Sequence, residues 1–191
     1  MVISLQKGQT VSLEKSGGGS LTVVRMGLGW DAVTRRGLFR SKQAEIDLDA
    51  TAVLYDGRGG VVDQVWFQQL RSKDGSVVHT GDNRTGAGDG DDESIRVDLA
   101  ALPAQVTTMV FVVNSFTGQD FSQIENAFCR LVDETTGEEL ARYDLSASGT
   151  HTAQVMAKVT RMTSGWSMTA IGAVAHGRTF RDLLPAIAPH V

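Results

Sequence analysis

Hydrophobic and polar residues alternate with a period of two through most of the chain, and glycines interrupt the pattern at frequent intervals. This alternation is typical of half-buried β-strands. It predicts strands at residues 11–13, 21–28, 46–54, 65–67, 76–79, 94–99, 109–114, 128–133, 139–143, 153–160 and 166–171. Because polar turns rather than long helices join these segments, we expect an all-β fold, an antiparallel β-sandwich.

Helical segments are expected to be few and short. Residues 122–126 predict a single turn, and Thr179 to Ile187 predict a short C-terminal helix that begins at Thr179. We therefore expect a sandwich domain over residues 1–175 and a C-terminal extension over residues 176–191.

Two loops have a distinctive composition. Lys73-Asp74-Gly75 predicts a hairpin turn between the strands at 65–67 and 76–79, because Asp-Gly tolerates positive φ. The basic segment from Arg35 to Lys42 is interpreted as a solvated loop.

Composition narrows the class of protein. A chain of 191 residues with 41% hydrophobic and 21% charged residues suits one soluble globular domain. It has no apolar run near the roughly 20 residues that span a bilayer, and Met1-Val2-Ile3-Ser4 does not resemble a signal peptide, so we expect a cytoplasmic protein. A net charge of −4 argues against nucleic acid as a partner. The single cysteine, Cys129, excludes an intramolecular disulfide and is expected to pack as a small apolar residue.

The charge is concentrated in one segment. Residues 82–93 read DNRTGAGDGDDE and contain five carboxylates, three glycines and one arginine. The segment charge of −4 equals that of the whole chain, so the remaining residues sum to zero. Crowded carboxylates repel one another unless a cation lies between them. Calcium accepts six to eight oxygen ligands at irregular angles, which a glycine-rich loop can supply.

The segment matches neither of two familiar calcium-binding motifs. An EF-hand needs oxygen ligands at its third and fifth positions and glycine at its sixth, where this chain has Arg84, Gly86 and Ala87. The Gly-x-Gly-x-Asp pattern of calcium-binding β-helix repeats occurs once rather than in tandem. Magnesium ranks second because it needs a tighter octahedron, and zinc is disfavoured because the loop has no His or Cys. A solvated acidic turn remains the alternative without a metal.

Further acidic residues are candidates for the same site. Asp47 and Asp49 alternate on one strand, so their side chains share a face, and Asp31 follows the turn-like sequence Gly27-Leu28-Gly29-Trp30. His79 lies three residues before Asp82 and is a candidate for contacts behind the metal ligands.

No motif indicates catalysis. The chain has no Gly-x-Ser-x-Gly elbow, no His-Glu-x-x-His and no phosphate loop. The alternative from another class is a metal-dependent phosphohydrolase that uses the same carboxylates. Direct binding of an oxyanion is disfavoured by the negative charge of the loop.

Several motifs together resemble the TerD family of tellurite-resistance and stress-response proteins. The resemblance extends from Gly8 to about Gly172, and the segment from Gly81 to Glu93 is its most specific part. The matching motifs are Gly27 to Asp31, Asp47 to Ala50, Gly81 to Asn83, Gly90 to Glu93, Asn126 to Arg130 and Glu138 to Leu145.

The resemblance implies a calcium-binding β-sandwich with two ions in adjacent sites, without catalytic activity, in a bacterial cytoplasm. It also implies a role in resistance to tellurite and related stress, with other proteins of the same operon as partners at the membrane surface. Carried over to this sequence, the implied metal ligands are Asp82, Asn83, Asp91, Asp92 and Glu93, with Asp31, Asp47 and Asp49 as contributors.

Overall fold

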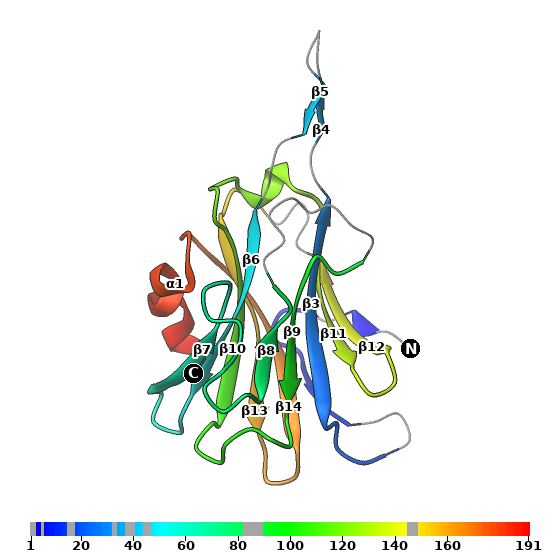
Figure 1. Ribbon diagram of the computed structural model, residues 1–191, viewed down its shortest axis with the longest axis vertical. Helices are drawn as coiled ribbons and strands as arrows, with labels where there is room; N and C mark the ends of the chain where they lie inside the picture. Colours follow the sequence, from blue (N-terminus) through cyan, green and yellow to red (C-terminus); the bar gives the residue numbers. More distant parts are fainter. Residues whose placement is uncertain are drawn as a thin grey trace.

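Two six-stranded sheets pack face to face in a computed structural model of the chain (Figure 1). The structure describes residues 3–4, 6–14, 18–31, 34–36, 41–43, 47–81, 90–144 and 149–191. One sheet, sheet A, has the strand order β1-β12-β11-β3-β9-β8, and the other, sheet B, has the order β2-β14-β13-β10-β6-β7. The expected all-β sandwich is therefore confirmed.

Sheet A is antiparallel except for its first pair, β1 and β12, which is parallel. Its strands are β1 (Ile3–Ser4), β3 (Val23–Asp31), β8 (Val77–His79), β9 (Glu93–Asp98), β11 (Glu125–Asp133) and β12 (Glu138–Asp144). Sheet B is antiparallel throughout its described pairs. Its strands are β2 (Thr10–Ser12), β6 (Leu48–Tyr55), β7 (Val61–Val65), β10 (Thr108–Ser115), β13 (Ala153–Arg161) and β14 (Trp166–Ala175).

The main core lies between the two sheets. Alternate residues of β3 and β6 enter it, including Met26 and Leu28 from β3 and Ala52 and Leu54 from β6. The other face of β6 is buried too, because Val53 and Tyr55 pack in a second cluster with helix α1 (Phe180–Ile187). Both faces of β6 are therefore buried along its length, as expected for a strand covered on each side.

Helix α1 covers the outer face of sheet B, where Phe180 meets Trp66 edge to face at 5.0 Å between ring centroids. It begins after Thr179, which forms a capping box with Asp182, as predicted from the sequence. A 3-10 turn, η2 (Ala188–His190), follows it. The turn predicted at 122–126 is the 3-10 helix η1 (Phe121–Gln123), which begins one residue earlier than expected and ends at Gln123, so that Glu125 and Asn126 belong to β11.

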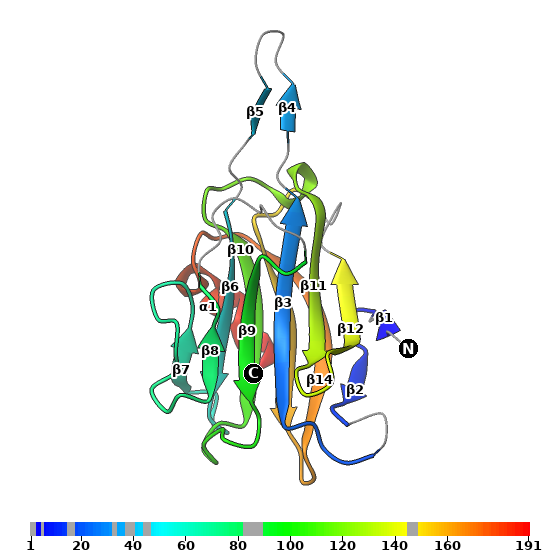
Figure 2. The ribbon, with the colours of Figure 1, turned by 45° about the vertical axis from the view of Figure 1, so that its right-hand side comes forward.

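Two predictions need correction. The strands before and after the Asp74-Gly75 turn are not hairpin partners, because β7 belongs to sheet B and β8 to sheet A. The turn instead closes a short hairpin after β7, with Gly75 at φ 81°. In it Arg71 and Val78 form an isolated bridge, the Ser72 N–H donates to the Val77 carbonyl at 2.9 Å, and the His79 N–H donates to the Leu70 carbonyl at 2.8 Å. The basic segment forms a two-stranded ribbon of β4 (Thr34–Arg36) and β5 (Ser41–Gln43) that projects beyond the sandwich (Figures 1 and 2).

Candidate metal-binding end of the sandwich

Strands β3 and β9 place the acidic residues at one end of sheet A. The two strands are antiparallel, with Leu28 opposite Glu93, so β3 ends where β9 begins (Figure 2). The chain before β9 continues alongside β3, because the Asp92 N–H donates to the Leu28 carbonyl at 2.8 Å and the Trp30 N–H donates to Asp92 Oδ2 at 3.0 Å. Asp91 and Asp92 are therefore held against β3.

Two glycines of β3 make this close approach possible. A Cβ atom at Gly29 would lie 2.5 Å from the Gly90 carbonyl oxygen and from the Phe128 ring. A Cβ atom at Gly27 would overlap the Asp91 carboxylate. The Gly-Leu-Gly-Trp sequence thus alternates glycines that admit the acidic segment with Leu28 and Trp30, which are buried in the core.

Asp91 is nearly buried, with 6% of its side chain exposed, and it is held by two arginines. Arg25 pairs with Asp91 Oδ2, and Arg130 Nε donates to Asp91 Oδ1 at 2.7 Å. The bond to Asp91 is the main cause that raises the pKa of Arg130. Each arginine also forms an ion pair with a glutamate at the outer edge of the network, Arg25 with Glu134 and Arg130 with Glu139. Asp91 therefore fixes the end of the acidic segment to sheet A.

Asp92 and Asp31 form the acidic pair nearest to the end of the sheet. Burial raises the pKa of Asp92 above its ordinary value, the Trp30 N–H opposes that shift, and the charges of Asp31, Asp91 and Glu93 add to it. Asn126 has a left-handed φ of 50° at a bulge of β11 and donates from Nδ2 to Asp31 Oδ2 at 2.5 Å. Negative charge is thus concentrated where β3 ends.

Glu93 points into the sandwich rather than toward its end, and it is fully buried. Its Oε2 accepts the Ala50 N–H at 2.9 Å, in the part of β6 that extends beyond its pairing with β7. His79 Nδ1 accepts the Gly81 N–H at 3.1 Å, so a neutral ring carries its proton on Nε2. That nitrogen lies 3.4 Å from Glu93 Oε2 and 3.2 Å from the Ala50 carbonyl. Glu93 and His79 therefore join sheet A to β6.

Asp47 and Asp49 are both buried, at 7% and 3% exposure. Asp49 alternates with Ala50 and so shares the outer face of sheet B with Val53. Asn114 donates to Asp49 Oδ2 at 3.0 Å and to the Arg178 carbonyl at 2.6 Å. Asp49 thus belongs to a network that leads toward α1.

The structure therefore separates the predicted ligands into different environments. Asp92 and Asp31 lie together, Asp91 is paired with arginines, and Glu93 and Asp49 make bonds within the sandwich. Asp82 and Asn83 lie outside the described residues. Within the described ranges, no three His, Cys, Asp or Glu side chains converge as a metal site.

Two residues at this end of the sandwich could not be identified as part of the site from the sequence. Arg25 and Arg130 lie on strands far apart in the chain, and nothing local marks them as partners of Asp91. The alternating glycines at 27 and 29 were the one usable signal, because a glycine inside a strand often marks a close backbone approach.

The fold and this end define a two-sheet sandwich with an acidic segment laid along one strand. The TerD domain family matches residues 1–185, and the chain belongs to that family. It is 49% identical over 185 residues to the tellurium resistance protein TerZ of Serratia marcescens, covering 95% of each chain. It is 41% identical over 185 residues to general stress protein 16U of Bacillus subtilis (strain 168), covering 93% of each.

A solved structure has the same fold. The crystal structure of a homologue of the telluride resistance protein TerD from Streptomyces coelicolor A3(2) superposes with a TM-score of 0.71 at 22% identity. The match covers 88% of this chain and 96% of that chain.

Proposed function

We propose that this chain is a non-catalytic stress-response protein that binds calcium at the end of the sandwich formed by β3 and β9. In this proposal the protein acts as a binding or scaffold module for other proteins, and that activity depends on bound calcium. The names of its relatives support the biological role, since they are tellurium resistance and general stress proteins and none names an enzymatic activity.

The observation that carries the proposal is the charge at the end of β3. Asp92 is partly buried, and its pKa is raised by burial and by three neighbouring carboxylates. Two more potential ligands, Asp82 and Asn83, precede it in the same acidic segment. A hard divalent cation would offset this repulsion, and carboxylate and amide oxygens are the ligands that calcium prefers.

The contacts suggest a division of roles among the acidic residues. We assign Asp31 and Asp92 as ligands, together with Asp82 and Asn83. Asp91 anchors the segment through Arg25 and Arg130, and Glu93 fixes β9 to β6. Bound calcium would supply the positive charge that offsets these carboxylates.

The proposal extends to the cellular setting. None of the helices in the described part of the chain has the length and apolar character needed to span a bilayer. We propose that the protein acts in the cytoplasm, with other stress-operon proteins as partners at the membrane surface. A pull-down with and without calcium would test whether those contacts depend on the metal.

Calorimetric titration tests the metal site. Calcium added to chelator-treated protein should give saturable heat with two ions per chain, and magnesium should bind more weakly. Asp31→Asn and Asp92→Asn should each weaken calcium binding, whereas Asp144→Asn serves as the matched control, because Asp144 is an exposed acid of β12 that pairs with Arg142. Absence of calcium heat would refute the proposal. Turnover of phosphate esters with magnesium or manganese would instead support the phosphohydrolase alternative.

A further inference from the structure

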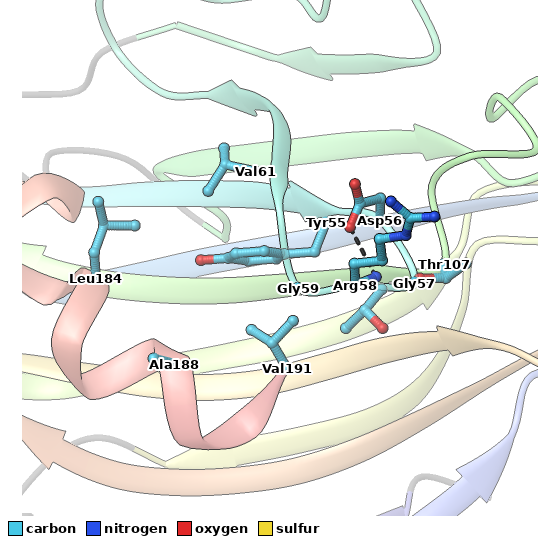
Figure 3. A pocket seen from close by; sticks show the side chains of 11 residues that line it. Tyr55, Asp56, Gly57, Arg58, Gly59, Val61, Thr107, Leu184, Ala188 and Val191 are labelled. Carbon is cyan, nitrogen blue, oxygen red and sulfur yellow. Dashed lines mark hydrogen bonds between the residues drawn. The ribbon is translucent and has the colours of Figure 1, made fainter.

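A cavity of about 600 Å³ lies between the turn that joins β6 to β7 and the C-terminal segment of α1 and η2 (Figure 3). Tyr55, at the end of β6, lines it. Leu48, at the start of β6, is seven residues away, which at about 3.3 Å per residue is roughly 23 Å. The cavity is therefore separate from the acidic end of the sandwich.

Tyr55 provides a buried polar group in this cavity. Only 4% of the residue is exposed, and its ring lies between Val61 and Val191 with the hydroxyl directed toward Leu184 (Figure 3). Among the described residues, none forms a hydrogen bond with this hydroxyl. Burial raises the pKa of Tyr55 to about 12, so the group keeps its proton at physiological pH. The hydroxyl lines the cavity, so a ligand there can accept a hydrogen bond from it.

The walls of the cavity differ in polarity. Leu184, Ala188 and Val191 form an apolar wall from the C-terminal segment. Arg58 lies at the opposite side, in the β6–β7 turn (Figure 3). Pockets of 300–1,000 Å³ with apolar walls and a few polar groups are typical of small-molecule sites.

The Arg58 guanidinium has no carboxylate within ion-pair distance in the described part of the chain. Its neighbour Asp56 is committed to the turn, because Asp56 Oδ1 accepts the N–H groups of Arg58 and Gly60 at 2.8 Å each. These two hydrogen bonds are the main causes that lower the pKa of Asp56, and the nearby charge of Arg58 makes a smaller contribution. The positive charge of Arg58 can therefore meet an anion at the rim.

We propose that this cavity binds a small organic anion with an apolar body. The apolar body packs against the Tyr55 ring, Leu184 and Val191, and its anionic group pairs with Arg58. An acceptor atom of the body accepts a hydrogen bond from the Tyr55 hydroxyl. The site is independent of the calcium proposal.

The test uses the whole chain and the fluorescent probe 8-anilinonaphthalene-1-sulfonate, which has an aromatic body and one sulfonate. We expect saturable binding at one site per chain. Ala188→Trp, which fills the cavity, should weaken binding about tenfold or more. Arg58→Gln, at an exposed position, should weaken it roughly two- to fivefold. The matched control Arg142→Gln lies on sheet A and should leave the affinity unchanged.

Two further measurements separate the contribution of the sulfonate from that of the apolar body, and this site from the metal site. Uncharged N-phenyl-1-naphthylamine should bind wild type and Arg58→Gln equally, because it lacks the sulfonate. A calcium chelator should not change the affinity for the sulfonate probe. The proposal for this cavity is therefore tested independently of the proposed metal site. Equal binding by wild type, Ala188→Trp and Arg58→Gln, each shown to be folded by its thermal melt, would overturn the proposal, as would absence of saturable binding.

Discussion

The Asp91 carboxylate lies against the backbone of Gly27, in the space that a Cβ atom would occupy. This contact brings Asp91 within reach of Arg25 and Arg130, which flank Gly27 on β3 and β11. A glycine in the middle of a strand weakens it, because glycine has no side chain to pack. At this position the lost packing is replaced by an ion-pair network that holds the acidic segment.

Alanine at these glycines should lower the free energy of unfolding to different extents. Gly29→Ala should cost about 2–3 kcal/mol, because its Cβ would meet the Gly90 backbone and the Phe128 ring. Gly27→Ala should cost about 1–2 kcal/mol, because the Asp91 side chain can move aside. The control Gly57→Ala should stay within about 0.5 kcal/mol, since its nearest neighbour would be Thr107 at 3.7 Å. Urea unfolding measures all three, and an equal loss at the three positions would contradict this account.

Asp91 and Asp92 should respond differently to neutralisation. Asp91→Asn should destabilise the calcium-free protein by about 1–3 kcal/mol, because it leaves Arg25 and Arg130 without their shared carboxylate. Asp92→Asn should relieve repulsion in the calcium-free protein and remove most of the response to calcium. Thermal melts of both variants with and without calcium make the comparison. Loss of the calcium response in Asp91→Asn, with stability unchanged, would identify Asp91 as a ligand instead.

Stability should fall at alkaline pH because of Cys129. Burial, with a further contribution from the charge of Asp91, raises the pKa of Cys129 to about 12. Above pH 8.5 the unfolded chain loses the thiol proton while the folded chain keeps it, so the free energy of unfolding decreases as pH rises. The slope approaches about 1.4 kcal/mol per pH unit, and Tyr55 adds a second such decrease above pH 10.

Urea unfolding at pH 7 to 10 measures this slope. Cys129→Ala should flatten the decrease between pH 9 and 10, whatever its effect at pH 7. An identical slope in wild type and Cys129→Ala would show that the thiol ionises freely in the folded protein.

The fold was predictable because its information is local. Period-two alternation predicted the strands, and Thr179 marked the start of α1. The pairing of strands was harder to predict from the sequence. The Asp74-Gly75 turn suggested a hairpin, but the strands on either side of it, β7 and β8, belong to different sheets. A turn motif determines the bend but does not determine which edge each strand joins.

The candidate site was predictable only in part. The acidic composition of 82–93 identified the segment, but the contacts that distinguish Asp91 from Asp92 come from β3 and β11, far away in the chain. Asp49 illustrates the same limit, because alternation predicts that it shares a face with Asp47 but not that Asn114 binds it. Long-range partners of this kind leave no local pattern in a single sequence.

The most direct test of calcium binding is the melting temperature of the whole chain with calcium and with chelator. At a calcium concentration of 100 times Kd, binding to the folded state should add about 2.7 kcal/mol. For a chain of this size that corresponds to a rise of roughly 5–10 °C, reversed by chelator. Asp92→Asn should show little of this rise, whereas Asp144→Asn should show all of it. Identical melting temperatures of the wild-type protein with calcium and with chelator would contradict the calcium-binding function.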